Sequence, residues 1–202
     1  MAEGKIRRLI DQINAKPPLK ESYVNPEAPY SRYIISPYHA LSPLRKPHYQ
    51  FLTEWIKGSM EEDESILEIG CGVGLWGYYL KQLGYENYVG VDINRLLIEI
   101  GKEATNLDLR IMDGTQLKLE DNSFDFVGYV NSFFNYEKND CRNFVKEALR
   151  VSRKWIEFDT VLNEINFAKS PTKEEMKEWL GDKIVVEMPL AQGRYLWIGK
   201  VE

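Results

Sequence analysis

From residue 47 onward, apolar positions follow two different spacings along the chain. Short apolar runs, which indicate buried strands, occupy residues 66–69, 87–91, 107–112, 124–130 and 155–160. The segments that follow most of these runs have apolar residues three and four positions apart, which predicts helices at 73–83, 94–104, 138–151 and 172–180. Strands that alternate with helices build a parallel sheet with helices on both faces.

The C-terminal part of the chain has a different pattern. Residues 183–188 and 194–201 read as two strands joined by a short turn with Gly193, and no helix fits between them. Strands connected in this way pair as an antiparallel hairpin. We therefore expect an α/β fold, a three-layer sandwich around a mostly parallel seven-stranded sheet that ends in a hairpin. Thr172 and Glu175 have the spacing of a capping box at the start of the last helix.

The first 60 residues differ from the rest and predict a helical and irregular N-terminal extension. Residues 2–15 and 47–57 have helical spacing, and Gly58 is expected to end the second helix. Between them, residues 16–47 contain seven prolines, which exclude long regular elements. Two interpretations stay open for this arm: a lid that forms part of the substrate pocket, or a segment that only covers apolar surface. We treat 1–60 as an extension of the same domain and 61–202 as its core.

A glycine-rich stretch from Ile66 to Gly77 carries the first chemical information. A strand containing Glu68 leads into glycines at positions 70, 72 and 74. Glycines allow the backbone to approach a ligand, and the helix predicted after them offers unpaired N–H groups to an anion. Two ligand classes fit such a turn: a dinucleotide, because Gly72-x-Gly74-x-x-Gly77 matches the Rossmann fingerprint, and S-adenosylmethionine.

Two acids at strand ends separate these ligand classes. Asp92 ends the second strand, where a carboxylate can accept both hydroxyl groups of an adenosine ribose. Asp113 ends the third strand. Asp113 has no regular role in a dinucleotide site, whereas it could accept a hydrogen bond from the amino group of an adenine.

The order Glu68-x-Gly70-x-Gly72-x-Gly74, Asp92, Asp113 resembles that of the class I S-adenosylmethionine-dependent methyltransferases, which have a Rossmann-like seven-strand sheet. The resemblance covers residues 65–202 as an element order and is sharpest over 66–113. It implies S-adenosylmethionine as cofactor and S-adenosylhomocysteine as product. It assigns cofactor binding to Glu68, Gly70, Cys71, Gly72, Gly74, Asp92, Ile93, Met112, Asp113, Gly114 and Asn131.

The resemblance implies particular roles for most of these residues. The glycine turn holds the methionine end of the cofactor, with Glu68 near its amino group. Asp92 holds the ribose, and Ile93 packs on the adenine. Asp113 accepts the adenine amino group, with Met112 alongside.

The segment 131–136 follows the fourth strand and is expected at the same edge of the sheet as the glycine turn. Members of the family that methylate base amines often carry Asn/Asp-Pro-Pro-Phe/Tyr here, but this chain lacks the prolines. A nucleic acid is therefore the least favoured acceptor. The aromatic residues of the segment either form a pocket wall or pack at the strand end. Asp159, which ends the fifth strand, either attracts a cationic amine or caps a turn.

A general base is needed only if the acceptor must lose a proton. Candidates for catalytic residues are Asn131, Tyr136, His39, Tyr30 and Tyr38. His39 and His48 lack a helical zinc spacing, and Cys71 and Cys141 form no metal motif, so we predict no metal site.

Composition adds limits on location and partners. No apolar run approaches the ~20 residues of a membrane span, and the N-terminus shows no signal peptide. We expect a cytoplasmic protein with reduced thiols and no membrane contact. Residues 1–50 carry eight basic and four acidic side chains, and the remainder carries 18 basic and 27 acidic ones. The basic arm either contacts an anionic partner or packs on the acidic core.

Three functions remain open at this point. The first is methyl transfer to a small-molecule or protein side-chain acceptor by in-line displacement, mainly through proximity and orientation. The second is an NAD(P)- or flavin-binding oxidoreductase, against which stand Glu68, Asp113 and the short chain. The third is a cofactor-binding partner subunit without activity. The oligomeric state is not encoded in any pattern that we recognise.

Overall fold

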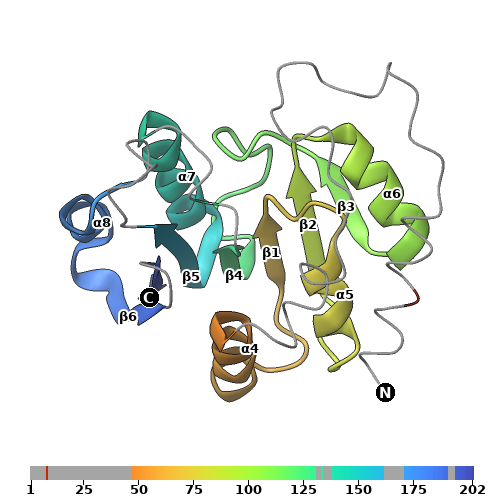
Figure 1. Ribbon diagram of the computed structural model, residues 1–202, viewed down its shortest axis with the longest axis horizontal. Helices are drawn as coiled ribbons and strands as arrows, with labels where there is room; N and C mark the ends of the chain where they lie inside the picture. The colour runs from red at the N-terminus through yellow and green to blue at the C-terminus, as the bar shows by residue number, and fades with distance from the viewer. Residues whose placement is uncertain (1–7, 9–46, 131–132, 134–137, 162–170, 191–193) are drawn as a thin grey trace. The chain divides into compact units, whose positions relative to one another are not determined.

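The computed structural model describes residues 8, 47–130, 133, 138–161, 171–190 and 194–202 (Figure 1). The predicted helix at 2–15, apart from Arg8, and the proline-rich arm up to residue 46 lie outside the described residues. The turn with Gly193 and the segment 131–136, apart from Phe133, also lie outside them.

Seven strands form one sheet in the order β3-β2-β1-β4-β5-β7-β6. Parallel pairing joins β1 to β4, β2 to β3 and β4 to β5, whereas β7 pairs antiparallel with β5 and β6. This order confirms the mostly parallel Rossmann-like sheet with a C-terminal hairpin. The strand bounds are β1 Ile66–Ile69, β2 Tyr88–Asp92, β3 Asp108–Ile111, β4 Phe124–Tyr129, β5 Ser152–Val161, β6 Ile184–Leu190 and β7 Arg194–Lys200.

The described helices are α4 Pro47–Ser59, α5 Leu75–Lys81, α6 Arg95–Thr105, α7 Lys138–Val151 and α8 Lys173–Leu180. Several predicted helix bounds differ from these by one or two residues. Gly58 does not end α4, which continues to Ser59. The helix predicted at 73–83 begins at Leu75, because Gly74 has a left-handed backbone with φ 75° and caps it.

The chain divides into two compact units. The first contains residues 47–63 and 71–111, with α4, α5, β2, α6 and β3. Its glycines admit close packing: Cβ atoms built on Gly74, Gly90 and Gly101 would lie 3.0, 2.7 and 2.5 Å from the Leu109 side chain of β3. Leu109 is fully buried and lies close to Gly101 of α6, Gly90 of β2 and the N-cap residue Gly74 of α5.

Gly77 on α5 gives a prediction about stability. A Cβ atom on Gly77 would lie 2.2 Å from the Tyr88 ring on β2, whereas no atom of the described residues lies within 4 Å of one on Gly58 in α4. We expect Gly77→Ala to lower the free energy of unfolding by about 1–3 kcal/mol through overpacking. Gly58→Ala should instead raise it by about 0.5–1 kcal/mol, because alanine favours a helix interior. Urea unfolding of both variants would measure this, and a stabilised Gly77→Ala would disprove the close contact.

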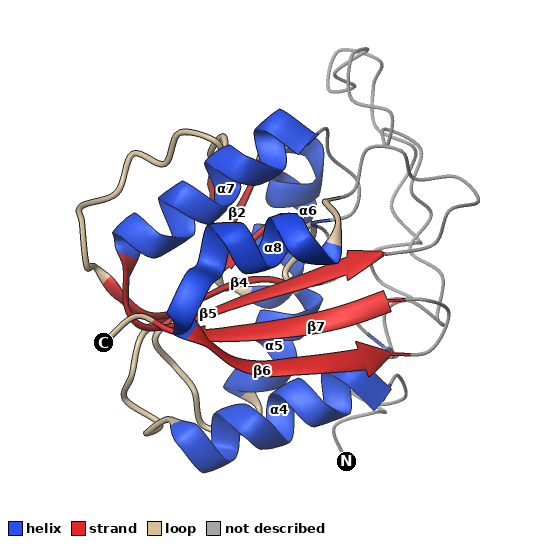
Figure 2. Cartoon of the chain, turned by 90° about the vertical axis from the view of Figure 1, so that its left-hand side faces the viewer, coloured by secondary structure: helices blue, strands red, loops and turns tan. Residues whose placement is uncertain are grey.

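The second unit contains residues 64–70 and the described residues from 112 to 202. Figure 2 shows β5, β7 and β6 side by side, with α7 and α8 along one side of these strands. An aromatic cluster packs α7 on the sheet: Tyr129 lies 5.0 Å from Phe144 and 5.4 Å from Phe158, between ring centroids. At the start of α8, Thr172 and Glu175 form the predicted capping box, with bonds of 2.8 and 3.2 Å.

Candidate active site

The glycine turn of the first unit connects β1 to α5. The Gly74 N–H donates to the Cys71 carbonyl at 2.9 Å, and the Cys71 N–H donates to the Val91 carbonyl of β2 at 3.1 Å. Gly72 has φ 57°, a left-handed backbone that side chains rarely allow. Among the described residues, a Cβ atom on Gly72 would meet only Leu97, at 4.0 Å. The backbone at Gly72 is therefore open to close approach from the side where a Cβ would stand.

Asp92 fastens this turn to the end of β2. Its Oδ2 accepts a hydrogen bond from the Gly72 N–H at 2.9 Å, and its Oδ1 accepts one from the Asn94 N–H at 2.8 Å. The Asn94 side chain in turn caps α6. Burial raises the pKa of Asp92, and the two N–H donors partly oppose this. Each carboxylate oxygen has two lone pairs, so Asp92 can still accept two hydroxyl groups.

These bonds change one sequence-based expectation. The N–H groups of Cys71, Gly72 and Gly74 all donate to other protein groups. The helix that follows has only seven residues. The turn therefore contributes close backbone approach and the Asp92 carboxylate, and these three N–H groups are not available to an anion.

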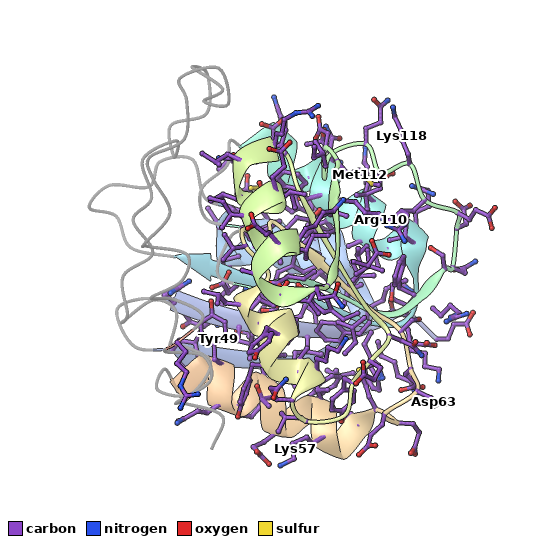
Figure 3. The ribbon with its side chains drawn as sticks, turned by 90° about the vertical axis from the view of Figure 1, so that its right-hand side faces the viewer. Tyr49, Lys57, Asp63, Arg110, Met112 and Lys118 are labelled. Atoms are coloured by element: carbon purple, nitrogen blue, oxygen red, sulfur yellow. The ribbon has the colours of Figure 1, made fainter. Side chains whose placement is uncertain are left out.

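Two exposed apolar side chains lie beside Asp92 in the first unit. Ile93 follows it directly and is 54% exposed, and Ile111, the register partner of Asp92 on β3, is 45% exposed. Apolar surface at this place suits the flat face of a base. Sequence reasoning assigned Ile93 but missed Ile111, although it is the last residue of its strand. Arg110, labelled in Figure 3, pairs with Asp108 at 2.6 Å and is thereby engaged on its own strand.

In the second unit, Asp113 is exposed and has a defined orientation. Its Oδ1 accepts hydrogen bonds from the Thr115 N–H at 2.8 Å and from the Thr115 hydroxyl at 2.7 Å. Gly114 is buried, and its carbonyl accepts a hydrogen bond from the Tyr129 hydroxyl at 3.2 Å. Met112, labelled in Figure 3, is half-buried.

Glu68 belongs to a row of residues across the second unit's strands. It is 4% exposed and pairs in register with Gly128 of β4, which pairs with Glu157 of β5. Gly128 leaves room for Glu157, whose Oε2 would be 3.1 Å from a Cβ at that position. Among the described residues, Glu157 Oε2 has no hydrogen-bond partner. Sequence reasoning missed Glu157, although a charged residue inside an apolar strand was a visible signal.

Burial raises the pKa of Glu157 well above its ordinary value, and the charges of Asp159 and Glu68 raise it further. The Tyr129 backbone and Arg194 oppose this shift. Glu157 therefore favours its neutral form more than an exposed glutamate does.

Asp159, expected either to attract a cationic amine or to cap a turn, is paired with a cation of the same chain. It is 1% exposed and forms an ion pair with Arg194 of β7. The cation that pairs with Asp159 therefore comes from the chain itself.

Several predicted site residues lie outside the described part of the chain: Asn131, Tyr136, His39, Tyr30 and Tyr38. Phe133 is described and fully buried, with its ring 4.9 Å from that of Phe158. It is a packing residue and does not form a pocket wall. Cys71 and Cys141 are buried, and neither forms a disulfide among the described residues.

Two kinds of feature are absent from the described residues. No group of three or more histidine, cysteine, aspartate or glutamate side chains there could hold a metal ion. Of the helices described, none combines the length and apolar character needed to cross a membrane.

Comparison with known proteins gives a consistent family. The methyltransferase domain family matches residues 66–154. The YqeM protein of Bacillus subtilis (strain 168) is 28% identical over 109 residues, which cover 51% of this chain and 44% of that protein. The ribosomal protein L11 methyltransferase of Paraburkholderia phymatum is 32% identical over 53 residues, or 26% of this chain and 18% of that protein. The chain thus spans less than half the length of these relatives.

A solved structure shows the same fold. Magnesium protoporphyrin IX methyltransferase from Synechocystis PCC 6803, with bound S-adenosylhomocysteine, has a TM-score of 0.67. It is 11% identical, and the match covers 97% of this chain and 94% of that one. The domain match covers less than half of this chain, and together with the strand order and the glycine turn tied to Asp92 it agrees with the resemblance to the class I S-adenosylmethionine-dependent methyltransferases.

Proposed function

We propose that the protein transfers the methyl group of S-adenosylmethionine to a small molecule or a protein side chain. The observation that carries this proposal is the hydrogen bond from the Gly72 N–H to Asp92. It joins the two parts of the motif that the family resemblance assigns to the cofactor. The oxidoreductase alternative has no counterpart in the family match.

The first unit's contribution to the cofactor follows from its geometry. Asp92 keeps a lone pair on each oxygen for the two ribose hydroxyl groups, and its half-buried position strengthens such bonds. Gly72 allows the methionine end to approach the backbone. Ile93 and Ile111 supply apolar surface for the base.

The second unit's contribution is proposed residue by residue from the resemblance. Asp113 accepts the adenine amino group, and Met112 and Gly114 flank it. Glu68 and Gly70 serve the amino-acid end of the cofactor. The remaining cofactor assignments, Cys71 and Asn131, stay predictions, as do the catalytic assignments Tyr136, His39, Tyr30 and Tyr38.

The chemistry required from the chain is modest. The bound cofactor supplies a methyl group on a positively charged sulfur. The protein must orient the acceptor's lone pair in line with the bond that breaks and exclude water. Orientation of this kind lowers a barrier by roughly 7–11 kcal/mol. A base is required only for an acceptor that loses a proton.

We infer the class of acceptor from the connections between the strands of the core. The described chain has no large insertion between its strands, which favours a small molecule or a single protein side chain. The names of two similar proteins, a ribosomal protein methyltransferase and a protoporphyrin methyltransferase, are in keeping with these two classes of acceptor.

Thermal unfolding with added ligands tests the cofactor. A ligand that binds only the folded protein, at 100 times its Kd, stabilises it by about 2.7 kcal/mol. We expect S-adenosylhomocysteine to raise the Tm and NAD and NADP to leave it unchanged. A shift with a nicotinamide nucleotide alone would overturn the proposal. Normal S-adenosylhomocysteine binding without methyl transfer to any extract would favour a partner subunit.

A further inference from the structure

The loop after β3 holds Asp113 in one orientation through Thr115. Both donors of Thr115, the backbone N–H at 2.8 Å and the hydroxyl at 2.7 Å, bond to the same oxygen, Oδ1. The Gln116 N–H closes the turn on the Asp113 carbonyl at 3.2 Å. Within the described structure, Oδ2 of this exposed carboxylate receives no hydrogen bond. Asp113 thus presents one free acceptor oxygen in a fixed direction.

The same loop is fastened to the second unit on both sides of Thr115. The buried Tyr129 hydroxyl donates to the Gly114 carbonyl at 3.2 Å. The Leu117 N–H donates to Glu147 of α7 at 2.7 Å, and Arg150 of α7 donates to the Leu117 carbonyl at 3.0 Å. A Cβ atom on Gly114 would lie 2.6 Å from Ile69, so the loop also packs closely. The backbone on either side of Thr115 is held without its hydroxyl.

We propose that Thr115 is a positioning residue that sets the purine specificity of the cofactor site, by aiming the free oxygen of Asp113 at a 6-amino group. This inference rests on the proposed function, in which Asp113 meets the adenine. A purine 6-amino group donates to Oδ2, whereas a 6-oxo group at the same place brings two acceptors together and is rejected. A freely rotating carboxylate would turn toward the N1–H of the 6-oxo base and discriminate less.

Different residues hold the backbone of this loop and orient the Asp113 carboxylate. Tyr129, Glu147 and Arg150 hold the loop's backbone. The Thr115 hydroxyl bonds to the Asp113 side chain. Its removal therefore acts on the carboxylate more than on the fold.

Isothermal titration of the full chain with S-adenosylhomocysteine and S-inosylhomocysteine tests the proposal. These ligands differ at the purine 6 position. We expect the unaltered protein to prefer the amino ligand, and Thr115→Val to lose affinity for it by roughly tenfold, the scale of one hydrogen bond to a charged group. Affinity for the oxo ligand should hold or rise. Thr115→Ser, which keeps the hydroxyl, should restore the preference.

Two further variants complete the test. Ser123→Ala removes another exposed hydroxyl of this unit, bonded to the Glu120 carbonyl at 2.7 Å, and should leave both affinities unchanged. Asp113→Asn should lose the preference even with Thr115 intact. The proposal is overturned if Thr115→Val keeps the preference, or weakens both ligands equally. If the unaltered protein binds neither ligand, the proposed function itself fails, which is a distinct result.

Discussion

Asp92→Ala is expected to weaken S-adenosylhomocysteine binding by about 2–4 kcal/mol, or roughly 30- to 1000-fold. The variant removes the acceptors that we propose for the two ribose hydroxyl groups. It also removes the partner of the Gly72 and Asn94 N–H groups, at 2.9 and 2.8 Å, and so releases the glycine turn from the start of α6. Isothermal titration gives the affinity, and urea unfolding shows whether the variant is folded.

Asp108→Ala is the matched control for Asp92→Ala. Asp108 lies on the neighbouring strand β3, is exposed, and its side chain bonds only to Arg110 among the residues described. Its loss should leave affinity unchanged. If Asp92→Ala binds as tightly as Asp108→Ala does, the ribose is not held at the end of β2, and the assignment of the turn must be revised.

Glu157→Gln is expected to stabilise the protein, and more so at higher pH. Burial and the charges of Asp159 and Glu68 raise the pKa of Glu157 in the folded state. The folded protein then binds a proton that the unfolded chain releases above its own pKa, so stability falls as the pH rises through this window. Glutamine has no proton to lose. The gain should be absent below the unfolded pKa and grow by about 1.4 kcal/mol per pH unit between the unfolded and the folded pKa.

Urea unfolding between acid and neutral pH measures this difference. Glu187→Gln is the control, because Lys173 and Lys177 lower the pKa of Glu187. This carboxylate stabilises the fold above its unfolded pKa, and the contribution disappears as the pH falls through its folded pKa. Glu187→Gln should therefore give a smaller change of opposite sign at neutral pH. Equal stability of Glu157→Gln and the unaltered protein at every pH would mean that Glu157 is ionised at little cost.

Glu157 also has two features that are typical of residues at functional sites. Oε2 is buried without a partner among the described residues, and Glu157 lies in register with Glu68 through Gly128. Buried polar atoms of this kind are rare, and groups with strongly shifted pKa values cluster at functional sites.

Much of the fold could be predicted because its signals are local. Apolar runs, helical spacing and the hairpin tail located every described strand and helix to within a few residues. The errors concern the ends of helices. Gly58 was predicted to end α4, but it lies within this helix, and no atom of the described residues would be within 4 Å of a Cβ there. Gly74 was predicted to be helical, but it belongs to the glycine turn and caps α5. A single glycine does not reveal whether its backbone is left-handed, since that depends on its neighbours in space.

The sequence by itself determined the glycine turn, the acids at the ends of β2 and β3, and the resemblance to a family, because these depend on residues close together in the chain. Only the tertiary structure decided which distant residues meet. Register across β1, β4 and β5 placed Glu157 level with Glu68, and the pairing of β5 with β7 brought Arg194 to Asp159. A shift of one residue in a strand reverses the face of every side chain. Such pairings therefore follow from the packing of the whole sheet, and no local pattern encodes them.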